Sequence, residues 1–91
     1  MQKIKLSITG CLGRMGRQII KSSEISKNFK VVSVTETQIV NKKIYGLKPQ
    51  LNSEFAFKNA SIIIDFTVPK CTLEVLKIAT KLKKRVVIGT T

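Results

Sequence analysis

Apolar residues along the chain recur with two different periods. Four segments have the alternation or the short continuous apolar run of a β-strand, and these are residues 3–9, 30–36, 61–67 and 85–88. Two segments have the spacing of an amphipathic helix, and these are residues 14–24 and, after Pro69, residues 71–82. The order strand, helix, strand, loop, strand, helix, strand predicts an α/β fold with a doubly wound parallel sheet and right-handed crossovers.

The same spacing predicts which helical residues face the sheet. On the first helix these residues are Met15, Ile19 and Ile20, and on the second they are Leu73, Leu76, Ile78, Ala79 and Leu82. Residues 37–53 are polar and irregular, which predicts a long loop, and residues 54–58 fit either a short strand or a helical turn.

Length and composition indicate one small globular domain. The chain has 91 residues, of which 43% are hydrophobic, and this content excludes a disordered chain. No apolar run approaches the roughly 18 to 20 residues that span a bilayer. We therefore expect a cytoplasmic domain that does not bind a membrane. The predicted sheet ends where a ligand-binding loop normally begins, so we also expect a piece of a longer protein.

The charge is strongly positive, with 17 Lys and Arg against 5 Asp and Glu and a net charge of +12. Such a balance attracts polyanions, but only residues 81–85 are densely basic, which favours a solvated lysine-rich surface over a nucleic-acid interface. The chain has no His, and Cys11 and Cys71 are far apart in the sequence. We therefore expect no metal site and nominate no catalytic residue.

Three glycines follow the first predicted strand. Gly10, Gly13 and Gly16 form the pattern G-x-x-G-x-x-G at the start of the first helix. Glycines at such a junction allow a tight turn and let backbone amides approach a pyrophosphate, although a simple tight turn explains them as well. Glu36 closes the second strand 20 residues after Gly16, where a carboxylate accepts hydrogen bonds from a ribose. Together these features predict dinucleotide binding.

Basic residues near these glycines bear on the choice of cofactor. Arg14 lies in the first turn of the predicted helix and can reach a phosphate, whereas Arg17 fits a solvated helix face equally well. Thr37 follows Glu36, so no Arg stands there to hold a 2′-phosphate, although Lys42 and Lys43 lie later in the loop. This favours NADH over NADPH.

Asp65 is the only Asp of the chain and lies near the end of the predicted strand 61–67. We interpret it as a structural carboxylate that caps backbone amides before the following helix, and not as a catalytic acid. Cys11 is interpreted as a small filler in the glycine loop.

Three motifs together resemble one enzyme family. Residues 10–18 (GCLGRMGRQ), 64–69 (IDFTVP) and 87–91 (VIGTT) are similar to those of bacterial dihydrodipicolinate reductases, in the same order and at compatible separations. The resemblance covers essentially the whole chain, but only the N-terminal part of the family's enzymes. It implies that residues 1–91 are a truncated N-terminal NAD(P)-binding domain with an incomplete Rossmann-like sheet.

The resemblance also implies site residues for NADH or NADPH. The pyrophosphate would be held by Gly10, Cys11, Leu12, Gly13, Arg14 and Met15. Glu36 would hold the adenosine ribose, Phe66 and Thr67 would lie along the cofactor, and the nicotinamide would be approached by Gly89, Thr90 and Thr91.

The family reduces a cyclic dicarboxylate, 4-hydroxy-tetrahydrodipicolinate, in the diaminopimelate route to lysine. Its catalytic His and Lys residues and its homotetramer interface belong to a C-terminal domain, so the isolated chain is expected to be inactive. Three alternatives remain: another NAD-dependent amino-acid dehydrogenase, a small basic nucleic-acid-binding protein, and a truncated product without function.

Overall fold

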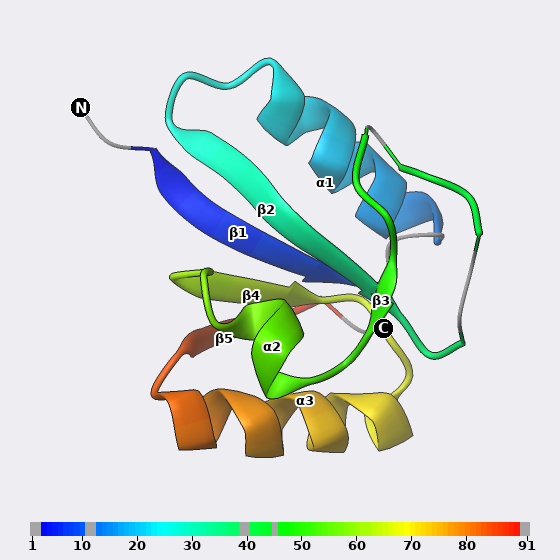
Figure 1. Ribbon diagram of the computed structural model, residues 1–91, viewed down its shortest axis with the longest axis vertical. Coiled ribbons are helices and arrows are strands. Elements are labelled where there is room, and N and C mark those ends of the chain that lie inside the picture. The colour runs from blue at the N-terminus through cyan, green and yellow to red at the C-terminus, as the bar shows by residue number, and fades with distance from the viewer. Residues whose placement is uncertain (1–2, 11–12, 39–40, 45, 90–91) are drawn as a thin grey trace.

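One parallel sheet organises the chain (Figure 1). The computed structural model describes residues 3–10, 13–38, 41–44 and 46–89. The sheet has the order β3-β2-β1-β4-β5, and every neighbouring pair is parallel. Its strands are β1 (Ile4–Thr9), β2 (Phe29–Glu36), β3 (Gln50–Leu51), β4 (Ile62–Asp65) and β5 (Arg85–Ile88). The helices are α1 (Arg14–Glu24), α2 (Glu54–Phe57) and α3 (Pro69–Leu82). The predicted α/β fold with a doubly wound parallel sheet is confirmed.

The structure settles one open prediction and corrects another. The segment 54–58, for which strand and helix both remained open, forms α2, because Ser53 caps it by accepting a hydrogen bond from the amide of Ala56 at 3.0 Å. The predicted loop 37–53 is wrong at one place, since it contains β3, which pairs with the end of β2. A two-residue strand is too short to show any apolar period, so the sequence pattern carries no sign of it.

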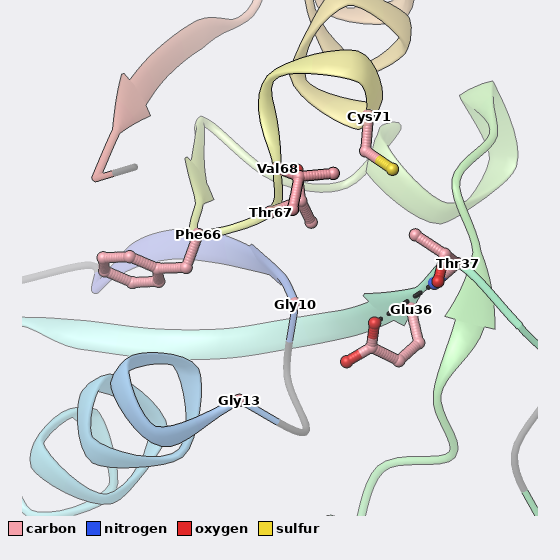
Figure 2. A pocket seen from close by; sticks show the side chains of 8 residues that line it. All are labelled: Gly10, Gly13, Glu36, Thr37, Phe66, Thr67, Val68 and Cys71. Carbon is pink, nitrogen blue, oxygen red and sulfur yellow. Dashed lines mark hydrogen bonds between the residues drawn. The ribbon is translucent and has the colours of Figure 1, made fainter. Parts of the chain in front are cut away.

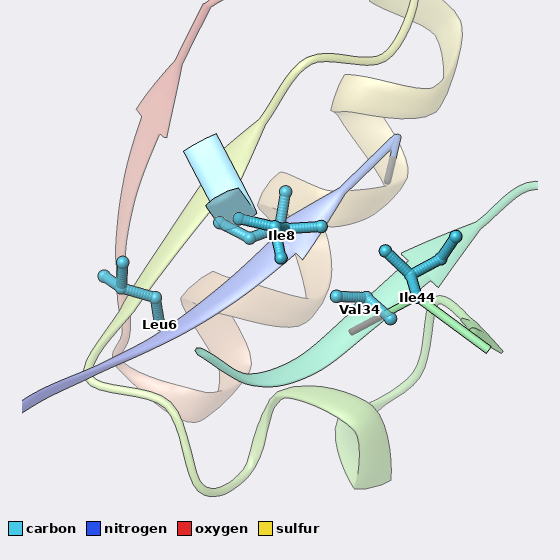
Figure 3. Packing of buried hydrophobic residues seen from close by; sticks show 5 residues of the cluster. Leu6, Ile8, Val34 and Ile44 are labelled. Carbon is cyan, nitrogen blue, oxygen red and sulfur yellow. The ribbon is translucent and has the colours of Figure 1, made fainter. Parts of the chain in front are cut away.

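The helices cover both faces of the sheet, with α1 on one face and α2 and α3 on the other (Figure 1). The first face buries a cluster made of Leu6, Ile8, Ile20, Val34 and Ile44 (Figure 3). The second buries Ala56, Phe57, Ile63, Val75 and Ala79. β4 contributes to both faces, because Ile63 packs under α3 while Ile62 and Ile64 pack against the first cluster. This explains its continuous apolar run.

The predicted buried faces of the helices are correct in most positions: Ile20 and Ala79 are buried, and Ile19, Ile78 and Leu82 pack against the two clusters. Two predicted residues are not buried. Met15 is 51% exposed and Leu73 is 63% exposed, whereas Ile20 and Val75 are fully buried. The residues buried on α1 are Gly16, Ile20 and Ser23, and those on α3 are Thr72, Val75 and Ala79. Small and weakly polar side chains let a helix lie close to the sheet, and a count of large apolar residues misses them.

Buried hydroxyl groups occupy the α2 side of the sheet. Ser7 and Ser33, on β1 and β2, hydrogen-bond to each other, and Ser33 Oγ donates to the carbonyl of Ala56 at 2.6 Å. These bonds attach α2 to the sheet and satisfy groups that would otherwise be costly to bury. Within the described residues, no helix is both long and apolar enough to cross a membrane.

Candidate functional site

Two adjoining pockets lie at the carboxyl ends of the strands. The first has a volume of about 350 Å³ and is lined by Gly10, Gly13, Glu36, Thr37, Phe66, Thr67, Val68 and Cys71 (Figure 2). The second has a volume of about 290 Å³ and is lined by Gly13, Arg14, Met15, Gly16, Phe66, Thr67, Val68, Pro69 and Gly89. Four residues line both, so we treat the two as one carboxyl-end groove. This is the edge at which open α/β sheets bind ligands.

Gly10 forms the floor where the glycine loop meets the loop after β4. Its φ of +75° lies in the left-handed region, and a Cβ there would stand 3.3 Å from the backbone carbonyl group of Phe66. A side chain at this position would therefore be strained and would also push against a neighbouring backbone. Gly13, the N-cap of α1, is bound back to this residue by its N–H, which donates to the carbonyl of Gly10 at 3.0 Å.

The N-terminus of α1 opens into the groove. Among the described residues no side chain caps it, and its first turn contains no acidic residue. The first amides of a helix have no partner within the helix and carry a partial positive charge, which makes such an end suited to an anion. Arg14 stands in this first turn and lines the groove, so a guanidinium reinforces the positive end.

Glu36 closes the side of the groove formed by β2. One of its carboxylate oxygens, Oε1, accepts a hydrogen bond from the amide of Thr37 at 3.2 Å (Figure 2). The carboxylate is half-buried and lines the same pocket as Gly10 and Gly13. It therefore places a hydrogen-bond acceptor beside the glycine loop.

Phe66 forms the opposite side of the groove. A Cβ on Gly89 would stand 2.2 Å from Cε1 of this ring, so the ring lies directly against the backbone after β5. The amide of Gly89 donates to the carbonyl of Asp65 at 2.8 Å, which ties that backbone to the end of β4. Only glycine leaves room for the aromatic ring in this arrangement.

Asp65 lies beneath the loop and is fully buried. Burial alone would raise the pKa of its carboxyl group, but hydrogen bonds from Thr67, Thr72 and Thr9 outweigh that effect and hold the pKa below its usual value. The amide of Thr67 donates to Oδ1 at 3.0 Å, so the predicted backbone cap is present.

In the described part of the chain, no group of three or more Cys, Asp and Glu could hold a metal ion.

Eight of the residues that the sequence nominated come together in the groove. They are Gly10, Gly13, Arg14, Met15, Glu36, Phe66, Thr67 and Gly89. The other four, Cys11, Leu12, Thr90 and Thr91, lie outside the described residues. Arg17 lies elsewhere, in a separate pocket of about 240 Å³ with Lys42, Lys43 and Ile44.

Several groups at this site were not among the predicted residues. Val68, Pro69 and Cys71 also line the groove, and their place directly after the buried strand 62–65 was the available signal. The hydroxyl partners of Asp65 on other elements, Thr9 and Thr72, left no local signal.

Solved structures confirm the architecture. The chain resembles the crystal structure of aspartate semialdehyde dehydrogenase II from Vibrio cholerae with a TM-score of 0.78 and 16% identity, covering 99% of this chain and 31% of that one. It resembles a Rex-family repressor with a TM-score of 0.75 and 10% identity, covering 99% of this chain and 53% of that one. It also resembles an NAD-binding protein from Listeria innocua, with a TM-score of 0.56 and 18% identity, covering 97% of this chain and 35% of that one. These likenesses show the fold.

Relatives in sequence share one enzyme name. The chain is 63% identical over 91 residues to a 4-hydroxy-tetrahydrodipicolinate reductase of Pelagibacter ubique (strain HTCC1062), covering 100% of this chain and 35% of the relative. It is 35% identical to the protein of that name from Wolbachia pipientis subsp. Culex pipiens (strain wPip), covering 98% of this chain and 38% of the relative. The chain thus spans about a third of the length of these relatives.

The family described as dihydrodipicolinate reductase, N-terminus, matches residues 4–91. This match includes the glycine loop, Glu36 and the loop after β4, which together form the groove. The chain belongs to the dihydrodipicolinate reductase family and corresponds to its N-terminal part.

Proposed function

We propose that this chain is the N-terminal NAD(P)-binding domain of a reductase acting on 4-hydroxy-tetrahydrodipicolinate in the diaminopimelate route to lysine. The observation that carries the proposal is the groove itself, which gathers a glycine loop, a helix N-terminus, an acidic strand end and an aromatic wall at one edge of the sheet. The names of the relatives support the choice of 4-hydroxy-tetrahydrodipicolinate as the proposed substrate.

The residues present fit a dinucleotide. A Cβ on Gly10 or on Gly13 would stand 3.3 Å from backbone atoms of the chain, so glycine allows this tight turn at the N-terminus of α1. A pyrophosphate in the groove would receive hydrogen bonds from the first amides of α1 and a charge contact from Arg14. Glu36 would accept hydrogen bonds from the two ribose hydroxyls of the adenosine. The wall formed by Phe66, Thr67 and Gly89 would face the nicotinamide half.

A bound nicotinamide dinucleotide supplies the hydride for such a reduction. The contribution of this chain is to bind and orient the dinucleotide. Delivery of a proton requires a further group, and the chain has no His. We propose that substrate binding, proton delivery and homotetramer assembly belong to the two thirds of the relatives that this chain does not match. The isolated chain is therefore an inactive binding domain, and we place it in the cytoplasm with the biosynthetic reaction.

The binding part of the proposal is tested with NADH and two charge-matched variants. Glu36→Gln removes the charge and replaces one of the two proposed acceptor oxygens with an NH₂ group, whereas Glu24→Gln makes the same change at the far end of α1. We expect Glu36→Gln to raise the Kd for NADH about ten-fold or more and Glu24→Gln to leave it within about two-fold, measured by calorimetry. Equal affinities in all three proteins would refute the ribose contact.

The inactivity of the isolated chain is tested separately. NADH oxidation is followed at 340 nm with freshly generated 4-hydroxy-tetrahydrodipicolinate and the purified 91-residue chain. We expect no oxidation above the rate without protein, because the acceptor is not held at reaction distance. Sustained turnover by the purified chain would show that it is a complete enzyme.

A basic pocket beside α1 makes NADPH a second candidate cofactor. Glu36 and the absence of an adjacent Arg favour NADH, because a carboxylate repels a 2′-phosphate. Arg17, Lys42 and Lys43, however, line one pocket and are joined there by no described acidic residue. We propose NADH as the preferred form. The ratio of the two Kd values decides the matter, and if NADPH binds more tightly, Lys43→Gln should reverse the preference.

A further inference from the structure

We propose that Asp65 is the positioning residue of the groove: its carboxylate holds the loop after β4 against the glycine loop and thereby sets the width of the dinucleotide site. The expected effect on NADH affinity rests on the proposed function. The expected effect on the position of the loop after β4 rests only on the hydrogen bonds of Asp65.

The carboxylate gathers donors from three segments of the chain. Oδ1 accepts from the hydroxyl of Thr9 at the end of β1, at 2.5 Å, and from both the amide and the hydroxyl of Thr67, at 3.0 and 2.5 Å. Oδ2 accepts from the hydroxyl of Thr72 in the first turn of α3, at 2.5 Å. An ionised carboxylate accepts at both oxygens, whereas an Asn offers only one acceptor oxygen.

These donors are adjacent to the walls of the groove. Thr9 directly precedes Gly10, and a Cβ on Gly10 would stand 3.4 Å from Cγ2 of Thr67. The backbone carbonyl of Asp65 also accepts from the amide of Gly89, behind the ring of Phe66. One residue therefore connects the floor of the groove with its aromatic wall. A loop released from the carboxylate would move against both.

The carboxylate acts through these neighbours and does not touch a ligand itself. Asp65 is fully buried and lines neither pocket of the groove. In the described part of the chain it makes no ion pair, so the cost of burying its charge is met by hydrogen bonds and by the positive end of α3. Removing a single donor leaves that charge less well compensated, and the loop then loses its fixed position.

The test uses the 91-residue chain with two kinds of variant. Asp65→Asn has nearly the same shape but loses one acceptor oxygen. Val75→Ala is the matched control, because it destabilises the same helix in the core and lies outside the groove. Thr72→Val and Thr72→Ser form a second pair, in which only Ser keeps the donor to Oδ2. Thermal midpoints, Kd for NADH and amide hydrogen exchange are measured for every protein.

We expect Asp65→Asn to weaken NADH binding about ten-fold and to speed exchange at the Thr67 amide by a similar factor, with the Val34 amide on β2 unchanged. Val75→Ala should lower the thermal midpoint and leave Kd within about two-fold. Thr72→Val should weaken binding, and Thr72→Ser should restore it.

Several results would overturn the inference. A folded Asp65→Asn protein with unchanged Kd and unchanged Thr67 exchange would do so, as would a Val75→Ala protein whose Kd rises as much as that of Asp65→Asn. If Asp65→Asn does not fold, the Thr72 pair decides, and equal binding by Val and Ser refutes the role. If the unaltered chain binds no NADH, the proposed function fails, and exchange at Thr67 in the nucleotide-free proteins alone decides the role of Asp65.

Discussion

Two glycines share a left-handed backbone but have different surroundings. Gly10 has a φ of +75° and Gly46 a φ of +82°. A Cβ on Gly10 would press on the backbone of Phe66 at 3.3 Å, whereas one on Gly46 would meet nothing within 4 Å. The pair therefore separates the cost of the backbone conformation from the cost of close approach within the groove.

We predict that Gly46→Ala lowers the free energy of unfolding by about 1 kcal/mol, the cost of the left-handed conformation, and that Gly10→Ala lowers it by about 2–3 kcal/mol. Urea unfolding of the two variants checks this. Gly10→Ala should also weaken NADH binding, and Gly46→Ala should not. Equal losses of stability would show that the loop of Phe66 moves aside freely.

Asp65 gives the stability of the chain a defined dependence on pH. Its pKa is held below the usual value in the folded state, mainly because the hydrogen bonds of Thr67, Thr72 and Thr9 exceed the effect of burial. The unfolded chain has the ordinary value of about 3.9, so the stabilisation is fully present above about pH 5 and is lost as the pH falls through the folded pKa.

We predict that the difference in unfolding free energy between the unaltered chain and Asp65→Asn is constant from about pH 7 to pH 5 and shrinks below about pH 4. Urea unfolding at a series of pH values measures it. Subtracting the variant removes the titration of the four Glu residues that both proteins share. A difference that grows on acidification would contradict the direction of the pKa shift.

Among the elements, those with long apolar periods were predictable and those made by partners were not. The residues of α1 match the predicted helix 14–24, and the continuous apolar run of β4 predicted burial on both faces. β3 exists because its two residues pair with the end of β2, a contact distant in sequence that a local pattern does not contain. For α2 the pattern left strand and helical turn open, and the cap from Ser53 selects the helix.

The buried face of α1 is tested by two substitutions. Ile20 is fully buried, whereas Met15 lies five residues earlier at the groove and is 51% exposed. We predict that Ile20→Ala lowers the free energy of unfolding by about 2–5 kcal/mol and that Met15→Ala changes it by less than about 0.5 kcal/mol. Chemical denaturation measures both. A large loss at Met15 would show that its side chain is packed, as the apolar spacing predicted.

At the scale of the whole molecule, the two edges of the sheet differ. The carboxyl ends of the strands form the groove with Glu36 and the N-terminus of α1. The amino ends form another pocket, of about 470 Å³, lined by Lys3, Ile4, Ser61, Ile62, Lys83 and Arg85. With a net charge of +12, nonspecific binding of an anion would use such basic positions. The two edges therefore distinguish a dinucleotide site from general attraction of polyanions.

The location of the groove was predictable because it follows from chain order. Parallel strands bring their carboxyl ends to one edge, so Gly10, Glu36 and Phe66 were expected at the same edge once the strands were identified, and the strand order β2-β1-β4 makes them neighbours. The contacts of Asp65 with Thr9 and Thr72 were not predictable. They depend on the register of β1 against β4 and on the rotation of α3, which tertiary packing sets.

Titration of the ¹⁵N-labelled 91-residue chain with NADH, followed by amide chemical shifts, shows directly whether the groove binds the dinucleotide. We predict saturable shifts at Gly10, Gly13, Glu36, Thr67 and Gly89, with Lys3, Ser61 and Arg85 at the opposite edge unmoved. Shifts confined to that basic edge, and reproduced by inorganic pyrophosphate alone, would contradict this prediction, as would a folded chain whose amides do not respond to NADH.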